Sequence, residues 1–249
     1  MAPFLSSTNR KGIILAGGSG KRLSPITIAI SKQLLPVYDK PMIYYPLTTL
    51  MLCGIRDILI ITTPESQCLF KNLLGDGEKW GISLNYLVQN KPDGIAHALL
   101  ISEDFIATSS IALVLGDNLF HGNNLISVLQ NANNRINENT VFGYSVNDPE
   151  RYAVVEFDSS GSIKNIEEKP EKASSPFAIT GLYFYDNSAV QRVKKLNFSS
   201  RGELEITSLN KHYLNNGLLK VELLGRGIAW FDTGTFDSLQ DASSYIRML

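Results

Sequence analysis

Residues 11–25, KGIILAGGSGKRLSP, join a short apolar strand to a loop in which three of the four positions 17–20 are glycine. Glycine lets the backbone approach a ligand closely or take a positive φ, and a run of free amides forms a concave trap for an anion. Lys21 and Arg22 follow directly and add two cations. This arrangement predicts that the loop cradles a polyphosphate, with an ordinary tight turn as the alternative.

The loop departs from both familiar phosphate-binding motifs. A Walker A sequence, G-x-x-x-x-G-K-[ST], would need glycine in place of Leu15 and a hydroxyl residue after Gly20 and Lys21. The dinucleotide fingerprint G-x-G-x-x-G matches Gly18 and Gly20 but has Leu23 where a third glycine should pack helix against strand. We therefore expect no P-loop, and a nicotinamide oxidoreductase is a disfavoured alternative.

The composition of the chain limits its class and its partners. Its 249 residues, 44% of them hydrophobic, can bury one large core. The 23 basic and 24 acidic residues are interspersed, with no polybasic tract for nucleic acid or an anionic membrane. Cys53 and Cys68 form no C-x-x-C pair, and no apolar run reaches about 18 residues. The opening MAPFLSSTNR is too short and too polar for a secretory signal, so we expect a cytoplasmic protein without nucleic-acid or membrane partners.

Short apolar runs alternate with amphipathic stretches in the first part of the chain, which is typical of βαβ units. The expected strands cover residues 12–17, 57–63, 84–89 and 110–118, and the expected helices cover residues 41–55, 65–74 and 93–105. The last of these strands ends in Asp117 and Asn118. Because open α/β sheets bind ligands outside the carboxyl ends of their strands, we expect this pair and the glycine loop to face one site.

After Asn139 the expected strands follow one another with short connections, which indicates a mixed sheet. The expected strands cover residues 140–146, 152–158, 163–170, 178–186 and 218–224, and a helix that opens on acidic residues covers residues 202–217. The prediction is a single α/β domain over residues 1–249, with a Rossmann-like mixed, largely parallel sheet flanked by helices. Its two lobes, residues 11–139 and 140–249, enclose a cleft.

Seven motifs are spread over nearly the whole chain. They are LAGGSGKRLSP…SKQLLPVYDKPMIYYPL (15–47), VQNKPDGIAHA (88–98), LVLGDN (113–118), EEKP (167–170), TGLYFYD (180–186), RGELEIT (201–207) and WFDTGT (230–235). In this order they resemble the sugar-1-phosphate nucleotidylyltransferases, most closely those that use dTTP and glucose 1-phosphate.

The resemblance implies a nucleotidyltransferase GT-A-like fold with a nucleotide-binding first lobe and a sugar-binding second lobe. The implied reaction transfers a thymidylyl group from dTTP to glucose 1-phosphate and releases pyrophosphate and dTDP-glucose, the first step towards dTDP-rhamnose and other dTDP-deoxysugars. One anion attacks another, so a divalent ion and fixed cations must counter their repulsion, and no protein nucleophile is needed. The resemblance also implies a homo-oligomer, either a dimer or a tetramer.

The resemblance also implies roles for individual residues. Asp117 and Asp232 would hold Mg²⁺, which suits carboxylate, water and phosphate oxygens. The implied nucleotide-binding residues are Gly17, Gly18, Gly20, Lys21, Arg22, Lys32, Gln33, Gln89 and Gly94. The implied sugar-binding residues are Asn118, Ala153, Glu168, Lys169, Ile179 and Thr180. Arg22, Lys32 and Lys169 would act on the phosphates in catalysis, while Gln89 and Gly94 would face the thymine.

The sequence departs from the family pattern in four places. Ala153 stands where a glycine beside the sugar is usual, and Lys21 replaces a small hydroxyl residue in the glycine loop. His97 occupies a position where glutamine is common, and we interpret it as structural. The chain stops at Leu249, whereas long forms continue into helices that carry subunit contacts and a regulatory site, so the sequence leaves open whether feedback control through that site is retained.

Three alternatives stay open from the sequence. A uridylyltransferase that uses UTP is the nearest one, because the thymine methyl is worth only ~1–3 kcal/mol of discrimination. The sugar could be another hexose 1-phosphate. A non-catalytic nucleotide-binding paralogue would be expected to lose a metal-binding aspartate or a phosphate-binding cation, and none is missing here.

Overall fold

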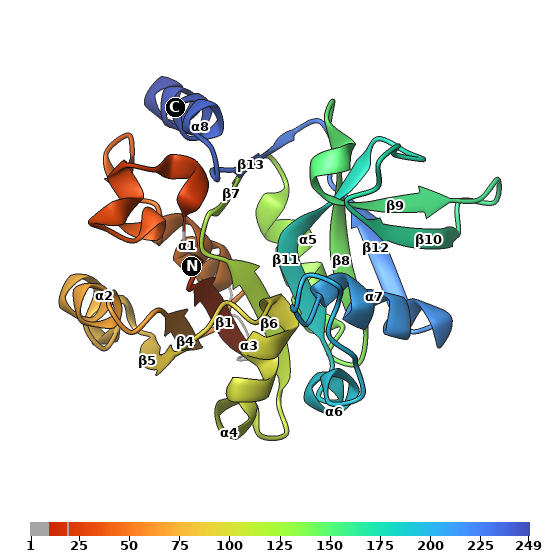
Figure 1. The fold of residues 1–249 in the computed structure, drawn as a ribbon, viewed down its shortest axis with the longest axis horizontal. Helices are drawn as coiled ribbons and strands as arrows, with labels where there is room; N and C mark the ends of the chain where they lie inside the picture. Colours follow the sequence, from red (N-terminus) through yellow and green to blue (C-terminus); the bar gives the residue numbers. More distant parts are fainter. Residues whose placement is uncertain (1–9, 19) are drawn as a thin grey trace, which may run out of the picture.

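The computed structural model describes residues 10–18 and 20–249, so the expectation for the first residues of the chain falls largely outside the described part. One mixed sheet of nine strands forms the centre of the molecule, with the order β10-β9-β11-β6-β1-β4-β5 and with β8 lying between β11 and β12 (Figure 1). The strands of this sheet are β1 (Arg10–Ala16), β4 (Asp57–Thr62), β5 (Ser83–Val88), β6 (Ser110–Leu115), β8 (Asn139–Ser145), β9 (Ala153–Phe157), β10 (Ile163–Glu168), β11 (Phe177–Tyr185) and β12 (Leu219–Leu223). The predicted mixed α/β fold is confirmed.

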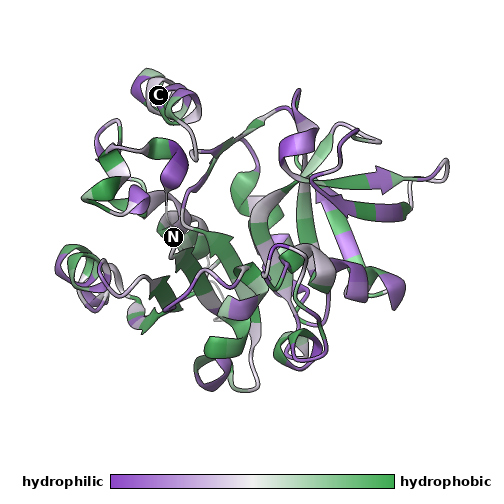
Figure 2. Ribbon diagram, in the orientation of Figure 1, coloured by the Kyte–Doolittle hydropathy of each residue, from purple (hydrophilic) through white to green (hydrophobic). Residues whose placement is uncertain are grey.

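Helices cover both faces of the sheet. They are α1 (Tyr44–Leu52), α2 (Gln67–Leu74), α3 (Ile95–Ile101), α4 (Glu103–Ile106), α5 (Leu125–Asn134), α6 (Ala189–Val193), α7 (Ile206–Asn215) and α8 (Phe236–Met248). Ile14 of β1 packs in a core with α1, α2 and α5, and Ile13 packs in a second core with α3, α4, α6 and α7. Successive strand residues point to opposite faces, and both faces are covered, which is why β1 is apolar from Gly12 to Ala16 (Figure 2).

Four strands from the first half of the chain form a continuous parallel part of the sheet, and β12 and β8 form a further parallel pair. β1 pairs in parallel with β4 on one side and with β6 on the other. β4 also pairs in parallel with β5. The carboxyl ends of these strands therefore lie along one edge, where the glycine loop follows β1 and Asp117 follows β6.

Strand β11 joins β8 and β9 to β6. Its end pairs antiparallel with β6, and its beginning pairs antiparallel with β8 and β9. Its pairing with β8 shifts between Ile179 and Tyr183. In that interval the amide of Gly181 donates to Asn118 Oδ1 at 2.9 Å, so the irregularity connects the sheet to the end of β6.

A two-stranded ribbon was not expected from the sequence. β7 (Asn118–Gly122) pairs antiparallel with β13 (Ile228–Asp232), and Asp232 lies opposite Asn118. A second short ribbon joins β2 (Pro36–Val37) to β3 (Lys40–Pro41), and α8 packs against β2 and β13. The β7–β13 ribbon brings the segment around residue 232 beside the end of β6.

Several expected helix boundaries are wrong, and two of the differences have a structural reason. The helix expected at 202–217 begins only at Ile206, because the amide of Leu204 donates to Asp93 O at 2.7 Å and its carbonyl accepts from Ala96 N at 3.1 Å. The helix expected at 93–105 is divided into α3 and α4 at Ser102, whose hydroxyl donates to Ala98 O at 2.6 Å. Among the described residues, no helix has the length and apolar character needed to span a membrane.

Candidate active site

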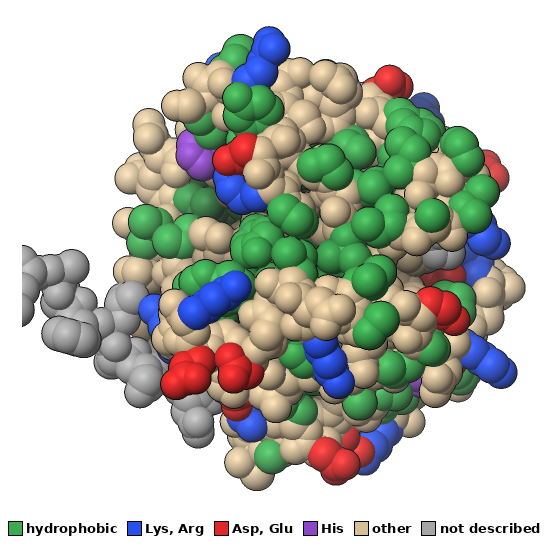
Figure 3. All heavy atoms as spheres, turned by 90° about the vertical axis from the view of Figure 1, so that its left-hand side faces the viewer, with side chains coloured by type: hydrophobic (Ala, Val, Ile, Leu, Met, Phe, Trp, Pro, Cys, Tyr) green, Lys and Arg blue, Asp and Glu red, His purple; other side chains and the backbone are tan. Residues whose placement is uncertain are grey.

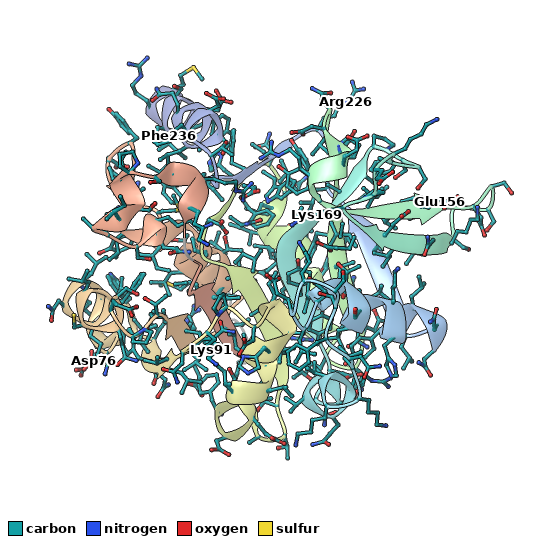
Figure 4. The ribbon with its side chains drawn as sticks, in the orientation of Figure 1. Asp76, Lys91, Glu156, Lys169, Arg226 and Phe236 are labelled. Carbon is teal, nitrogen blue, oxygen red and sulfur yellow. The ribbon has the colours of Figure 1, made fainter. Side chains whose placement is uncertain are left out.

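A cavity of about 510 Å³ opens at the carboxyl end of β6, and its other walls come from β9, β11, α7 and β13. Its lining includes Arg22, Asp117, Glu168, Lys169 and Asp232. The structure therefore brings together residues as far apart in the sequence as Arg22 and Asp232. Lys169 follows β10 and lies where β9 and β11 come together (Figure 4).

Asp117 is held on the floor of this cleft. Gly116 before it donates its amide to Leu15 O at 2.9 Å, and a side chain at Gly116 would stand 2.9 Å from the same oxygen. The carboxylate pairs with the ammonium group of Lys32 and accepts from Asn118 Nδ2 at 3.2 Å. Burial alone would raise the pKa of Asp117, but the charge and hydrogen bond of Lys32 outweigh it, so the pKa is lowered.

Asp232 is the second carboxylate of the cleft. Thr233 next to it donates to Asp117 O through its amide at 3.0 Å and through its hydroxyl at 2.7 Å, which fixes the two aspartates as neighbours. Burial and the charge of Asp117 raise the pKa of Asp232. Two adjacent, partly buried carboxylates with incomplete neutralisation are a donor set that suits a hard divalent cation.

Asn118 connects Asp117 to strands β11 and β13 through side-chain hydrogen bonds. Its Oδ1 accepts from the amide of Gly181 at 2.9 Å and from Trp230 Nε1 at 2.6 Å, while its Nδ2 donates to Asp117. A side chain at Gly181 would stand only 2.7 Å from this amide group. The predicted sugar-side position of Asn118 therefore lies at the cavity wall, with its amide already bonded to protein groups.

The glycine loop and its cations lie at the same edge. Arg22 lines the cleft, and a side chain at Gly234 would stand 2.7 Å from Arg22 Nη2. Gly20 has a φ of 60°, and a side chain there would come within 2.9 Å of Thr27, whose hydroxyl donates to Gly20 O at 2.8 Å. Gly18 is different, because a side chain there would meet only Lys32 Cε at 3.8 Å. Glycine at 20 is thus required by packing inside the loop, and glycine at 18 leaves room beside Lys32.

A smaller cavity of about 190 Å³ adjoins the glycine loop. It is lined by Gly17, Gly18, Gln89 and Gly94, all predicted for the nucleotide, and by Leu15, Pro92, Ile95 and Glu203. Gln89 follows β5, is 7% exposed and donates from Nε2 to Gly94 O at 3.3 Å. Gln33 is also buried, in the short turn with Lys32.

Five of the six residues predicted for the sugar lie on β9, β10 and β11 or directly after β10, and the sixth, Asn118, begins β7. Glu168 accepts from the hydroxyl of Thr207 and lies 3.4 Å from Arg201 Nη2 and 3.9 Å from Lys169 Nζ. Ala153 and Ile179 line the larger cavity, whereas Thr180 alternates to the opposite side of β11. The Thr180 hydroxyl is buried, and no described residue gives it a hydrogen-bond partner.

Sequence reasoning missed several residues of the cleft wall. They are Arg151, Tyr152, Tyr183, Glu205, Thr207, Asn210 and Trp230. Four of them stood inside or beside quoted motifs, as Thr207 does in RGELEIT and Trp230 in WFDTGT. Their position within a motif was therefore the sequence signal that could have identified these four as site residues. Asn210 of α7 lies outside the motifs and had no such signal.

The chain matches known proteins over nearly its full length. The family described as nucleotidyl transferase matches residues 11–248. Glucose-1-phosphate thymidylyltransferase of Xanthomonas campestris pv. campestris is 60% identical over 242 residues, which are 97% of this chain and 82% of that protein. The enzyme of the same name from Neisseria gonorrhoeae is 57% identical over 237 residues, or 95% of this chain and 82% of that protein.

Solved structures agree with this result. A Bacillus anthracis protein provisionally described as a glucose-1-phosphate thymidylyltransferase, in complex with sucrose, is 42% identical with a TM-score of 0.88 over 96% of each chain. A UDP-glucose pyrophosphorylase in complex with UDP-glucose is 24% identical with a TM-score of 0.83, over 96% of this chain and 99% of that one, and shows the shared fold alone. The chain therefore belongs to the nucleotidyl transferase family, among the sugar-1-phosphate nucleotidylyltransferases that its motifs resemble.

Proposed function

We propose that this chain transfers a thymidylyl group from dTTP to glucose 1-phosphate and releases pyrophosphate and dTDP-glucose. The observation that carries this proposal is one cleft in which the paired carboxylates Asp117 and Asp232 lie beside the cations Arg22, Lys32 and Lys169. Relatives that carry the name of this activity support the choice of nucleotide and sugar.

We assign the first lobe, residues 11–139, to the nucleotide. The triphosphate would bind along the glycine loop, on the amides of Gly17, Gly18 and Gly20 and on the side chains of Lys21 and Arg22. The base would enter the 190 Å³ cavity beside Gln89 and Gly94, with Gln33 nearby. The apolar part of this cavity wall suits the faces of a pyrimidine ring.

We assign the second lobe, residues 140–249, to the sugar phosphate. Glu168 offers carboxylate oxygens for hydroxyl groups, and Lys169 is half exposed at the cavity wall, where it can meet a phosphate. Ala153 and Ile179 would lie against the sugar ring, with Asn118 and the backbone of Thr180 behind them. Ala153 adds a methyl group to that wall.

The proposed reaction is a single in-line displacement. An oxygen of the sugar phosphate forms a bond to the α-phosphorus of dTTP, and the bond from that phosphorus to the β-phosphate oxygen breaks. Lys32 and Arg22 would hold the α-phosphate and the departing pyrophosphate, and Lys169 would hold the attacking phosphate. These cations lower the repulsion between two anions and fix their alignment.

We propose that Asp117 and Asp232 hold Mg²⁺, since their adjacent carboxylates fit a hard cation with further water and phosphate ligands. When bound, the ion supplies positive charge against the phosphate oxygens. Lys32 neutralises Asp117 in the structure, and it is placed to transfer its contact from carboxylate to phosphate when substrates bind.

We also propose that the protein acts as a homo-oligomer in the cytoplasm. The family resemblance supports this, as does the face that carries α2, α8 and the loop before Lys32, on which hydrophobic side chains gather (Figure 3). Ile28 in that loop is 80% exposed and Leu69 of α2 is 41% exposed. Such residues favour association between copies.

Pyrophosphate release with four nucleoside triphosphates against several hexose 1-phosphates tests the proposed function. We expect the highest kcat/KM for the pair dTTP and glucose 1-phosphate. A clear preference for UTP would replace the proposal with a uridylyltransferase. No release with any pair, while nucleotides still bind, would indicate a non-catalytic protein.

A further inference from the structure

We propose that His97 determines which base the nucleotide site accepts, by fixing the orientation of the Gln89 side-chain amide. The inference rests on the proposed function, because it needs the base to lie beside Gln89. It replaces the interpretation of His97 as a structural residue. His97 lies on α3, and its side chain is 23% exposed, next to the 190 Å³ cavity.

The contacts of Gln89 define which way its amide faces. Its Nε2 lies 3.3 Å from Gly94 O and 3.1 Å from His97 Nδ1. A backbone carbonyl can only accept, so the amide nitrogen must face Gly94. The same nitrogen then donates to His97, which requires His97 Nδ1 to be an acceptor without a proton.

The tautomer of His97 follows from this assignment. A neutral imidazole with an unprotonated Nδ1 carries its proton on Nε2. That nitrogen faces Asp93 Oδ2 at 3.9 Å. Asp93 is an acceptor, so it favours the tautomer that Gln89 needs. Asp93, His97 and Gln89 thus form a chain of polar groups that runs from the surface to the cavity.

The carbonyl of Gly94 is held in a fixed position, so it gives the Gln89 side-chain amide a fixed acceptor. Gly94 has a φ of 105°, and a side chain there would stand 2.4 Å from Leu204 O. Hydrogen bonds to Leu204 hold the chain on both sides of Gly94. The amide of Leu204 donates to Asp93 O, and the amide of Ala96 donates to Leu204 O. The loop therefore cannot shift to satisfy a flipped glutamine without losing these bonds.

The oxygen of Gln89 is consequently left facing the cavity as a hydrogen-bond acceptor. A side chain at Gly17, on the cavity wall, would stand 3.5 Å from this oxygen. Thymine and uracil present an N3–H donor on their imide edge, which can bond to it. Cytosine presents an acceptor at the same ring position, and its lone pair would face the Gln89 oxygen. The fixed amide therefore selects imide pyrimidines over cytosine.

Replacing His97 should weaken this selection. Without the ring acceptor, one amide hydrogen loses its partner, and only the longer contact with Gly94 O, at 3.3 Å, opposes rotation of the amide. The orientation that presents the Gln89 nitrogen to the base therefore becomes more populated. The nitrogen is a donor and can bond to N3 of cytosine. Since a net hydrogen bond changes an equilibrium by roughly tenfold, we expect changes of about that size.

The experiment compares His97→Leu and His97→Gln with the wild type, using dTTP, dUTP and dCTP. His97→Leu should raise KM for dTTP about tenfold, leave kcat within about twofold, and lower the dTTP to dCTP ratio of kcat/KM about tenfold. His97→Gln should retain the ratio, because its amide oxygen can accept from Gln89. Where turnover of dCTP is too slow to detect, its inhibition constant against dTTP supplies the ratio.

A matched control and a spectroscopic measurement complete the test. His212→Leu changes a histidine of α7 and should alter neither KM nor the ratio. In the folded enzyme, ¹⁵N NMR should show His97 Nδ1 without a proton. A proton on Nδ1, or an unchanged ratio in folded His97→Leu, would overturn the proposal.

Gln89→Leu separates this inference from the proposed function. If Gln89→Leu lowers the ratio and His97→Leu does not, the base lies at Gln89 and His97 has no role in selection. If both variants leave KM for dTTP and the ratio unchanged, the base lies elsewhere and the assignment of this cavity is wrong.

Discussion

The ammonium group of Lys32 forms an ion pair with the carboxylate of Asp117 on the floor of the cleft, where both side chains are only 12% and 11% exposed. This pair places a phosphate-binding cation and a proposed metal ligand in direct contact. Neither charge is left unpaired before substrates bind, which would be costly at such burial. Binding of a cation and a phosphate can then separate the pair, because each partner gains a new counter-charge.

Asp117→Asn is expected to lower kcat/KM by about 100-fold or more, because a neutral amide replaces an anionic ligand and leaves Lys32 without its partner. The measurement is pyrophosphate release at limiting Mg²⁺, together with circular dichroism to verify the fold. Asp241→Asn, at an exposed position of α8, is the matched control and should be neutral. Activity near that of the wild type would remove Asp117 from the metal site.

Asp232→Asn is expected to abolish most activity and yet to stabilise the fold at neutral pH. The pKa of Asp232 is raised by burial and by Asp117, so its ionised form is disfavoured in the folded state. The neutral carboxyl is compatible with the fold, so its contribution to the free energy of unfolding is fully present below the unfolded-state pKa near 3.8. This contribution is lost as the pH rises through the folded-state pKa, because Asp232 then ionises beside Asp117.

Thermal unfolding at two pH values checks this prediction. At pH 7, Tm of Asp232→Asn should exceed that of the wild type by roughly 2–4 °C, the shift that about 1 kcal/mol causes in a domain of this size. Well below pH 3.8 the difference should vanish, because the wild-type carboxyl is then protonated in both states. A variant that is less stable at pH 7 would show that Asp232 does not repel Asp117.

Lys169→Ala is expected to lower kcat as well as to raise KM for glucose 1-phosphate, because the cation should bind the attacking phosphate most strongly in the transition state. A loss of about 100-fold in kcat/KM would match removal of a charged contact. Lys169→Arg keeps the charge and should retain part of the activity, and exposed Lys172→Ala is the neighbouring control. An effect confined to KM for dTTP would move Lys169 to the nucleotide side.

Much of the fold could be predicted because its signals are local. β1 and β6 are buried on both faces, so each contains a continuous apolar run, residues 12–16 and 111–115, that ends in a glycine-containing loop. β7 was missed because its pairing partner β13 begins 106 positions after β7 ends, at Ile228 against Gly122. Nothing in residues 118–122 indicates that partner, since contact with a distant strand leaves no period in the sequence.

The site was predictable to a similar extent. The family resemblance predicted roles for Asp117, Asp232 and Lys32, and those roles stay predictions. The structure brings the three residues together, since Asp117 and Asp232 line the cleft and Lys32 pairs with Asp117. The helix at 202–217 was expected to open on Glu203 and Glu205, but Leu204 between them bonds to the loop at Asp93. The contact between His97 and Gln89 was also hidden, because it depends on how α3 follows β5 in space.

Gly18→Ala is expected to lower the affinity for dTTP about tenfold without changing the affinity for thymidine. Residue 18 lines both the base cavity and the space beside Lys32, and an added methyl group would have ordinary contact with Lys32 Cε at 3.8 Å, so the fold should tolerate it. The methyl group would instead occupy space that a phosphate needs near the loop amides. Calorimetric titration with dTTP and with thymidine measures the two affinities.

Gly20→Ala is the informative contrast to Gly18→Ala. At a φ of 60°, with Thr27 at 2.9 Å from the added carbon, this substitution should lower Tm whether or not phosphate binds there. Destabilisation by Gly20→Ala together with a selective loss of dTTP binding in Gly18→Ala would separate the packing role of one glycine from the phosphate-binding role of the other. Equal losses of dTTP and thymidine in Gly18→Ala would instead mean that residues 17–20 form a structural turn, and the triphosphate would have to be placed elsewhere in the cleft.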